Sequence, residues 1–227
     1  MNSMTLPSAN TARENMLKSQ ILPGHVLEER LLGALGSVAR ESFVPEAIKG
    51  SAYVDEDIPL GGGRFLMEPL TFARLLTHAA IKPHEMVLDI GAASGYSAAV
   101  IAHLAQKVVA VEEDAGLVAL AKATLAAYPN VEYVQAPLAQ GLSGRGPYDV
   151  IIIEGAIEVL PQALADQLCE GGRILACEHD AAPKTSITGL GKLVEYKKVR
   201  GMLYKTVLRD ASVALLAAFA KPKAFAF

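Results

Sequence analysis

The sequence predicts an α/β fold built on a doubly wound, mostly parallel sheet. From residue 86 onward, short runs of Val, Ile and Leu alternate with stretches in which apolar residues recur at helical spacing. Continuous apolar runs of this kind are typical of strands that helices cover on both faces. Helical patterns fill the first third of the chain, and two strand-like runs follow the series. We therefore expect an N-terminal helical extension over residues 1–80 and an α/β core over residues 81–227 with an antiparallel C-terminal hairpin, in one compact domain.

Helical spacing dominates the first eighty residues. Leu27, Leu31 and Leu35 recur every four residues, which places them on one face of a helix. Pro69 is a typical first residue of another helix. The apolar residues that share a face of this second helix are Phe72, Leu75, Leu76 and Ala79. Just before it lies "LGGGRFLMEP", residues 60–69, which is no phosphate-binding loop because no Lys-Ser or Lys-Thr pair follows the glycines.

Five apolar runs predict the parallel strands of the core. In chain order they read "MVLDI", "KVVAV", "VEYV", "YDVIIIE" and "GRILAC". We expect helices between them, one with Asp114 as its N-cap and one opened by Pro161 that buries Leu164 and Leu168. The runs "KLVEYKKV" and "MLYKTVL" are joined by Arg200-Gly201, a spacing that fits a tight antiparallel hairpin.

Composition excludes several classes of protein. The 227 residues are 52% hydrophobic and 20% charged, which suits a chain with a buried core and not a disordered one. A net charge of -3 lacks the basic footprint of a nucleic-acid-binding protein. No apolar run approaches about 18 residues, and the N-terminus has no basic segment before an apolar one. We therefore expect a cytoplasmic protein that binds neither nucleic acid nor membrane.

The cysteines and the last histidine predict no metal site. Cys169 and Cys177 make neither a disulfide framework nor a metal quartet, so we expect both to be small buried hydrophobes. His179 lies between acids in "CEHD", but adjacent side chains diverge on a strand, which excludes a metal triad there.

The first strand of the core and the turn after it predict a nucleoside site. In open parallel sheets, ligands bind at the carboxyl ends of the strands where the winding reverses. Gly91 and Gly95 let the backbone turn sharply and approach a ligand. Glu112 ends the second strand about 20 residues after Gly91, where a carboxylate can accept both ribose hydroxyls. We expect Glu112→Ala to weaken cofactor binding with little effect on thermal stability; the alternative is a turn that only packs helix on strand.

Two residues favour S-adenosylmethionine over a dinucleotide. A dinucleotide site requires glycine at the positions held by Ala93 and Tyr96. The stretch "DIGAASG" instead resembles motif I of the S-adenosylmethionine-dependent methyltransferases, with Ala93 in place of the middle glycine. We therefore expect the chain to bind S-adenosylmethionine and not NAD.

Residues 13 to 210 as a whole resemble the protein-L-isoaspartate O-methyltransferase family. The segments that carry the resemblance are "RLLGALGSVARESFVPEAIKGSAYVDEDIPLGGGRFLMEP", "VLDIGAASGYSAAVIAHLA", "VVAVEED" and "YDVIIIEGAIEVLPQALADQLCEGGRIL". The resemblance implies a Rossmann-like methyltransferase fold and a cytosolic enzyme that methylates the α-carboxyl of isoaspartyl residues in damaged proteins. It also places the family's active-site segment on residues 60–69.

The resemblance supplies the site residues and shows two departures. Met67 stands where the family has serine, and Ala136-Pro137-Leu138 stands where the family has Gly-Asp-Gly near the cofactor. The residues that the resemblance assigns to the cofactor are Asp89, Gly91, Ala92, Ala93, Ser94, Gly95, Tyr96, Glu112, Glu113, Pro137 and Leu138. Both departures indicate a divergent branch of the family.

Three residues are candidates for the chemistry. A sulfonium methyl is already electrophilic and a carboxylate already nucleophilic, so positioning and exclusion of water supply most of the rate. Arg64 can pair with a substrate carboxylate or be an exposed loop arginine. Glu154 can contact the substrate or act as a base, or it can cap the next helix. Met67, with Phe65 and Leu66, can form a water-excluding lid or simply close the core.

The sequence therefore predicts an S-adenosylmethionine-dependent O-methyltransferase that acts on a protein, peptide or small-molecule carboxylate. A methyltransferase with another acceptor, such as a hydroxyl or an amine, is the second interpretation. The third is a module that binds the cofactor and has lost transfer activity. The apolar tail "LLAAFAKPKAFAF" leaves room for a partner or homodimer contact.

Overall fold

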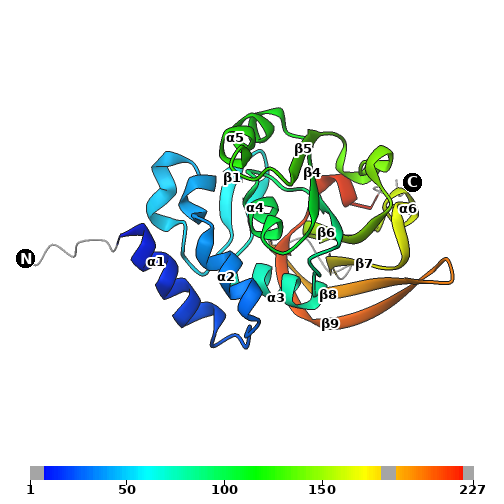
Figure 1. Cartoon of the computed structure of the whole chain (residues 1–227), viewed down its shortest axis with the longest axis horizontal. Coiled ribbons are helices and arrows are strands. Elements are labelled where there is room, and N and C mark those ends of the chain that lie inside the picture. The colour runs from blue at the N-terminus through cyan, green and yellow to red at the C-terminus, as the bar shows by residue number, and fades with distance from the viewer. Residues whose placement is uncertain (1–7, 180–187, 222–227) are drawn as a thin grey trace, which may run out of the picture.

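The computed structural model describes residues 8–179 and 188–221. The N-terminal helices lie at one end of the molecule, and a long C-terminal hairpin that belongs to the central sheet extends at the other (Figure 1). None of the helices within these residues is both long enough and apolar enough to cross a membrane.

The N-terminal extension is mostly helical, as the spacing predicted. Its α-helices are α1 (Ala9–Met16), α2 (Glu29–Ser37) and α3 (Pro69–Ala79). Leu27, however, lies before α2 and is exposed, so of the three predicted leucines only Leu31 and Leu35 share the buried helix face. Pro69 lies in the first turn of α3. Between α2 and α3 the structure adds a hairpin that the sequence did not predict, formed by β1 (Ile58–Gly61) and β2 (Arg64–Leu66). Gly62 and Gly63 make its turn with φ of 58° and 74°, a left-handed conformation that favours glycine.

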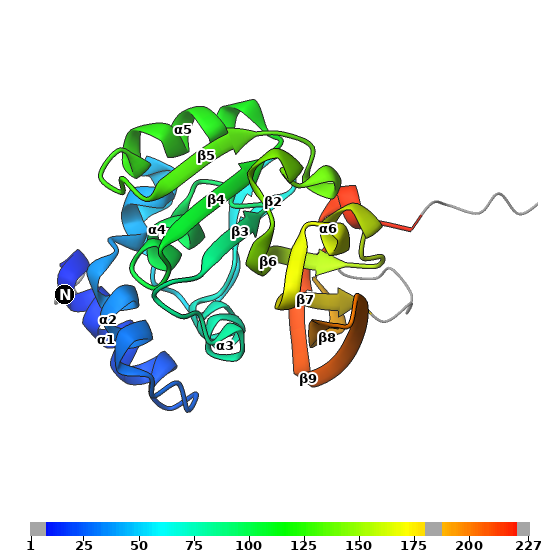
Figure 2. The same cartoon turned by 45° about the vertical axis from the view of Figure 1, so that its right-hand side comes forward.

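A seven-stranded sheet forms the core, and its first five strands are parallel. These strands are β3 (Met86–Ile90), β4 (Lys107–Glu112), β5 (Val131–Gln135), β6 (Tyr148–Ile157) and β7 (Leu168–His179). The antiparallel strands β8 (Thr188–Val199) and β9 (Met202–Ala214) complete the sheet. The spatial order is β5-β4-β3-β6-β7-β8-β9, so the winding reverses at β3, as Figure 2 shows.

Apolar side chains fill both faces of the sheet, which confirms the doubly wound prediction. Along β3, Val87 belongs to one buried cluster and Leu88 to the other, because successive side chains point to opposite faces. The first cluster packs against α2, α3, α4 (Tyr96–Ala102) and α5 (Ala115–Leu125). The second packs against α6 (Gln162–Asp166) and residues 216–219. Asp114 caps α5 as predicted, accepting a hydrogen bond from the N–H of Leu117.

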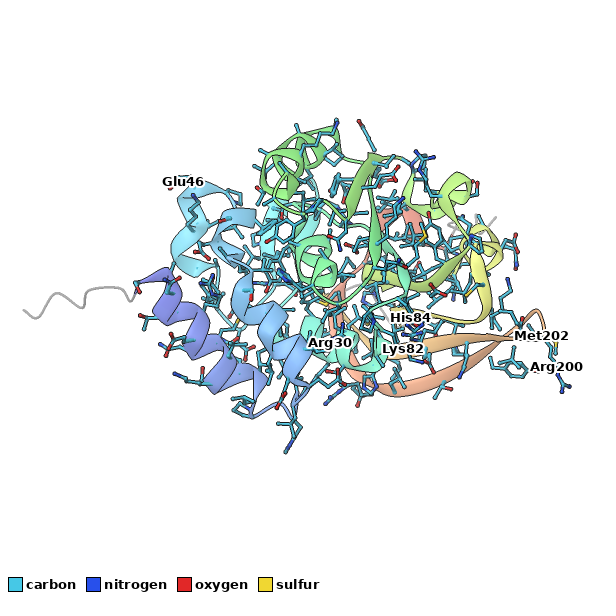
Figure 3. All side chains as sticks on the ribbon, viewed as in Figure 1. Arg30, Glu46, Lys82, His84, Arg200 and Met202 are labelled. Atoms are coloured by element: carbon cyan, nitrogen blue, oxygen red, sulfur yellow. The ribbon has the colours of Figure 1, made fainter. Side chains whose placement is uncertain are left out.

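Two details of the second half differ from the prediction. Helix α6 ends at Asp166, so Leu168 lies in β7 and not on a helix face. Strand β6 runs on to Ile157, with an irregular register against β7 between Ile152 and Ala156. The hairpin prediction is confirmed: Arg200 and Gly201 join β8 and β9 with φ of 52° and 75°, and Figure 3 shows Arg200 at its tip.

Arginine side chains fasten the helical extension to the core. Arg30 of α2 donates hydrogen bonds to the carbonyls of Ile81 and Leu104, at 3.1 and 2.6 Å (Figure 3). Arg173 of β7 donates to the carbonyls of Ala79 and Ala80 at the end of α3, and it makes a two-pronged ion pair with Glu85, with both distances 2.9 Å. Because these contacts join segments that lie far apart in the chain, they fix the position of α2 and α3 relative to the sheet.

Candidate active site

The candidate site lies where β3, β4 and β6 end. Since β3 is placed between the other two, the loops that leave β3 and β6 diverge and leave room for a ligand. Gly91 follows β3, Glu112 is the last residue of β4, and Glu154 lies near the end of β6. The sequence motifs that are separated along the chain thus meet at one edge of the sheet.

The turn after β3 has the backbone that its glycines predicted. Gly91, Ala93 and Gly95 all have positive φ, at 78°, 49° and 94°. A Cβ atom on Gly95 would lie 2.8 Å from a methyl group of Leu125, so close packing adds to the preference for glycine that the positive φ already gives. Ala93 adopts this conformation without being glycine, and its N–H donates to Oε2 of Glu112 at 2.9 Å.

Two buried polar atoms, one at the end of β3 and one in the turn that follows it, have no partner among the described residues. Asp89 accepts a hydrogen bond on Oδ2 from Ser97 at 2.7 Å, while its Oδ1 stays unpaired. The hydroxyl of Ser94 is unpaired as well. Burial raises the pKa of Asp89 to about 7, and the nearby charge of Glu112 adds to this effect. Sequence reasoning missed Ser97, although it lies in the quoted motif three residues after Ser94.

Asp89 should make the stability of the protein depend on pH. Its pKa is about 7 in the folded chain against an ordinary value of 3.8, so folding takes up a proton between those values. The free energy of unfolding should therefore fall as pH rises from about 4 to about 7. Denaturant titrations across this range should show that the free energy of unfolding falls less in Asp89→Asn than in the wild type. In Asp166→Asn, a control at an exposed position, it should fall as much as in the wild type. Equal slopes in all three proteins would contradict the raised pKa.

Glu112 is completely buried and its carboxylate is fully bonded. Oε1 accepts from the N–H groups of Glu113 and Asp114, at 2.9 and 3.1 Å. Oε2 accepts from Ala93 and from the guanidinium of Arg64, each at 2.9 Å. The side chain of Glu113 is exposed, while its N–H belongs to the group that holds the Glu112 carboxylate.

Arg64 is neither exposed nor free. It belongs to strand β2, retains 8% exposure, and donates through Nη2 to the carbonyl of Gly91 at 2.7 Å as well as to Glu112. A Cβ atom on Gly91 would lie 2.8 Å from this nitrogen. Its Nε has no partner among the described residues. Arg64 therefore covers the glycine turn and is hydrogen-bonded to Glu112, the carboxylate that we expected to bind a ribose.

A cavity of about 10 Å³ adjoins Arg64, roughly the volume that holds one water molecule. Leu216 lines it and packs closely on Gly155, where a Cβ atom would lie 2.6 Å from Leu216 Cγ. The residues that line the cavity are Asp57, Gly63, Arg64, Phe65, Met67, Glu154, Gly155, Val213, Ala214, Leu215 and Leu216. Asp57, the last of three consecutive acids at positions 55–57, is half-buried here. Leu216 and Phe219 pack on the core, so this part of the tail is no free surface.

Glu154 faces the same cavity. Its Oε1 is buried and without a partner in the described part of the chain. Burial, and then the charge of Asp89, raise the pKa of Glu154 well above its ordinary value. It lies inside β6 and does not cap α6, whose N-cap is Pro161, so that alternative is wrong.

Met67 has two roles in the structure. Met67 and Leu66 are 6% and 7% exposed and belong to the first core cluster, which fits the core-closing interpretation, while Phe65 is half-buried. Only Met67 of these two buried residues also lines the cavity. Its carbonyl accepts a hydrogen bond from Arg40 at 2.6 Å, which holds the backbone of the segment in place.

Three predicted cofactor residues direct their side chains away from the glycine turn or into the core. Tyr96 packs against Phe43 and Phe72, with Arg40 4.8 Å above its ring. Leu138 is 1% exposed within the second core cluster. Pro137, beside it, is exposed. Leu138 and Tyr96 can therefore meet a ligand only through their backbone.

The residues at the end of β3 fit S-adenosylmethionine, but the space above them is filled. The unpaired acceptors of Asp89, Ser94 and Glu154 suit a ligand that brings an amino group and hydroxyls. The positive φ of Gly91 suits close approach of a ligand to the backbone. Arg64 and Leu216 must move before such a ligand enters. Within the described ranges no group of His, Cys, Asp or Glu could hold a metal, and His179 instead bonds the carbonyl of Val213.

Comparison with known proteins gives a consistent set of relatives. A family model described as protein-L-isoaspartate(D-aspartate) O-methyltransferase matches residues 11–195. A protein-L-isoaspartate O-methyltransferase of a Synechococcus species is 39% identical over 72% of this chain and 68% of its own length. A protein of the same name from Koribacter versatilis is 34% identical over 87% of both chains. The crystal structure of a putative protein-L-isoaspartate O-methyltransferase from Plasmodium falciparum, in complex with S-adenosyl-L-homocysteine, shares the fold with a TM-score of 0.76 at 19% identity, over 93% of this chain and 99% of the other.

Proposed function

The chain belongs to the protein-L-isoaspartate(D-aspartate) O-methyltransferase family, and we propose that it transfers the methyl group of S-adenosylmethionine to the α-carboxylate of isoaspartyl residues in proteins or peptides. The observation that carries the proposal is the meeting of the glycine turn, Glu112 and the segment of Arg64 and Met67 at one edge of the sheet. We also propose that the protein works in the cytoplasm, where its two free cysteines stay reduced.

Some residues of the chain would bind the cofactor, and others would exclude water from the acceptor. Asp89, Ser94 and Glu112 would hold the cofactor through its amino group and hydroxyls. When bound, S-adenosylmethionine supplies an electrophilic methyl group on a sulfonium sulfur. Met67 and Leu216 keep water away from the acceptor, because both line the cavity with apolar side chains. The chain needs no strong base, since a carboxylate acceptor is already ionised at neutral pH.

A second candidate function follows from the two carboxyl groups that line the cavity. Asp57 and Glu154 both line it, and acids favour an acceptor that brings hydrogen-bond donors, such as a hydroxyl or an amine. Such a methyltransferase would use the same cofactor residues.

One assay separates these acceptors. Purified protein is incubated with methyl-labelled S-adenosylmethionine and an isoaspartyl peptide, its aspartyl twin, or a twin in which asparagine replaces that residue. We expect label in the isoaspartyl peptide, released by mild base as a methyl ester is, and little in the twins. Base-stable label would instead support a hydroxyl or amine acceptor, and label in no acceptor would contradict both functions.

A further inference from the structure

Arg64 is the only cation among the described residues that line the cavity. A carboxylate acceptor there would face Asp57 and Glu154, neither of which offers a positive charge. Without a cation, an anionic acceptor would lose its hydration and gain no opposite charge. An acceptor carboxylate therefore needs Arg64, but Arg64 is paired with Glu112 at 2.9 Å.

The Glu112 carboxylate does not depend on Arg64 for its position. Three backbone N–H groups, those of Ala93, Glu113 and Asp114, hold it at 2.9 to 3.1 Å. A ligand hydroxyl can therefore replace the Arg64 hydrogen bond on Oε2 and leave the carboxylate in place. The displaced guanidinium would then be a buried cation without its anion, which strongly favours the capture of another anion.

Arg64 can reach that anion without leaving the site. Its side chain lines the cavity together with Met67 and Glu154, and its Nε is buried with no partner among the residues described. A guanidinium presents several N–H groups in one plane, which suits a carboxylate. The same arginine can thus serve either the acid of the cofactor site or an acceptor in the cavity.

We propose that Arg64 is shared between Glu112 and the acceptor carboxylate: the cofactor's hydroxyls displace it from Glu112, and the released guanidinium then binds the acceptor. This inference rests on the proposed function. It makes binding ordered, with the cofactor first. Because coupling between two ligands is reciprocal, the acceptor must also tighten the cofactor by the same factor.

Calorimetric titration tests the proposal without any turnover, because S-adenosylhomocysteine carries no methyl group to transfer. The wild type should bind an isoaspartyl peptide at least about 10-fold more tightly with saturating S-adenosylhomocysteine than without it. Arg64→Met should bind S-adenosylhomocysteine about 10-fold more tightly than the wild type, because nothing competes for Glu112. Its affinity for the peptide should be low in both conditions. Arg145→Met, at an exposed arginine paired with Glu132, should match the wild type.

Each other outcome overturns the proposal. If Arg64→Met weakens S-adenosylhomocysteine, Arg64 holds the cofactor and does not compete with it. If peptide affinity is the same with and without S-adenosylhomocysteine, Arg64 is not shared. If neither the wild type nor the variant binds S-adenosylhomocysteine, Arg64 is not shared either. If Arg64→Met fails to fold, Arg64→Gln, which keeps a hydrogen-bond donor for Glu112, replaces it. This variant should also lose the coupling between S-adenosylhomocysteine and peptide binding. Ordered binding without methyl transfer would overturn the proposed function and leave this inference standing.

Discussion

Replacing Glu112 with alanine is expected to lower the free energy of unfolding by about 3–5 kcal/mol, the range for breaking a buried ion pair by removing one partner. The substitution leaves the buried guanidinium of Arg64 without its anion and three backbone N–H groups without an acceptor. Cofactor binding should weaken as well, by about 10-fold or more, because we propose this carboxylate as the acceptor for the ribose hydroxyls. The sequence alone led us to expect little change in stability; the contacts of Glu112 correct that expectation.

Denaturant titration at pH 7 measures the first effect and calorimetry with S-adenosylhomocysteine the second. Glu113→Ala is the matched control, because the same side chain is removed one residue later at an exposed position. Its unfolding free energy should stay within about 0.5 kcal/mol of the wild type. Glu112→Gln keeps the shape and removes the charge, so it should fall between the two. If Glu112→Ala melts like Glu113→Ala, the buried ion pair is not formed in solution.

The parts of the fold that could be predicted are those with a local cause. The runs that became β3 and β6 are apolar at most consecutive positions, and do not alternate, because both faces of the sheet are covered. Arg200-Gly201 made a hairpin because its neighbours on both sides read as strands. The β1–β2 hairpin was missed because its two strands have only four and three residues, too few to show a period. Leu168 was misassigned because an apolar residue after a short helix fits either element.

The site divides in the same way. Gly91 and Glu112 were predicted because a glycine turn followed by an acid about 20 residues later is a pattern typical of nucleoside-binding sites. The pairing of Arg64 with Glu112 could not be predicted from the sequence, because it joins residues 48 positions apart through the packing of β2 on the sheet. Leu216 was read as part of an apolar tail, and no local pattern indicates that it lies over Gly155. Asp57 reads as one acid of three in a turn, and only burial distinguishes it from Asp55.

Replacing Met67 with serine should raise methyl transfer to an isoaspartyl peptide while it weakens the fold. A thioether accepts hydrogen bonds weakly and donates none, so a polar acceptor group beside Met67 is left unpaired at a cost of about 1–3 kcal/mol. A hydroxyl at this position of the cavity lining can pair with that group. We therefore expect the specific activity, measured as kcat/KM for the isoaspartyl peptide, to rise by up to about 100-fold. The wild type should accordingly be a slow enzyme on this substrate.

The loss of stability provides the means to separate the two effects. Met67 is 6% exposed within the core cluster, so its truncation should cost about 2–5 kcal/mol. Leu66→Ser is the matched control: Leu66 is equally buried, at 7%, in the same cluster, but it does not line the cavity. Both variants should melt earlier, and only Met67→Ser should gain activity, assayed below both melting temperatures. If Leu66→Ser gains as much, loosening of the segment explains the increase; if neither gains, Met67 does not face the acceptor, and the active-site segment is placed wrongly on residues 60–69.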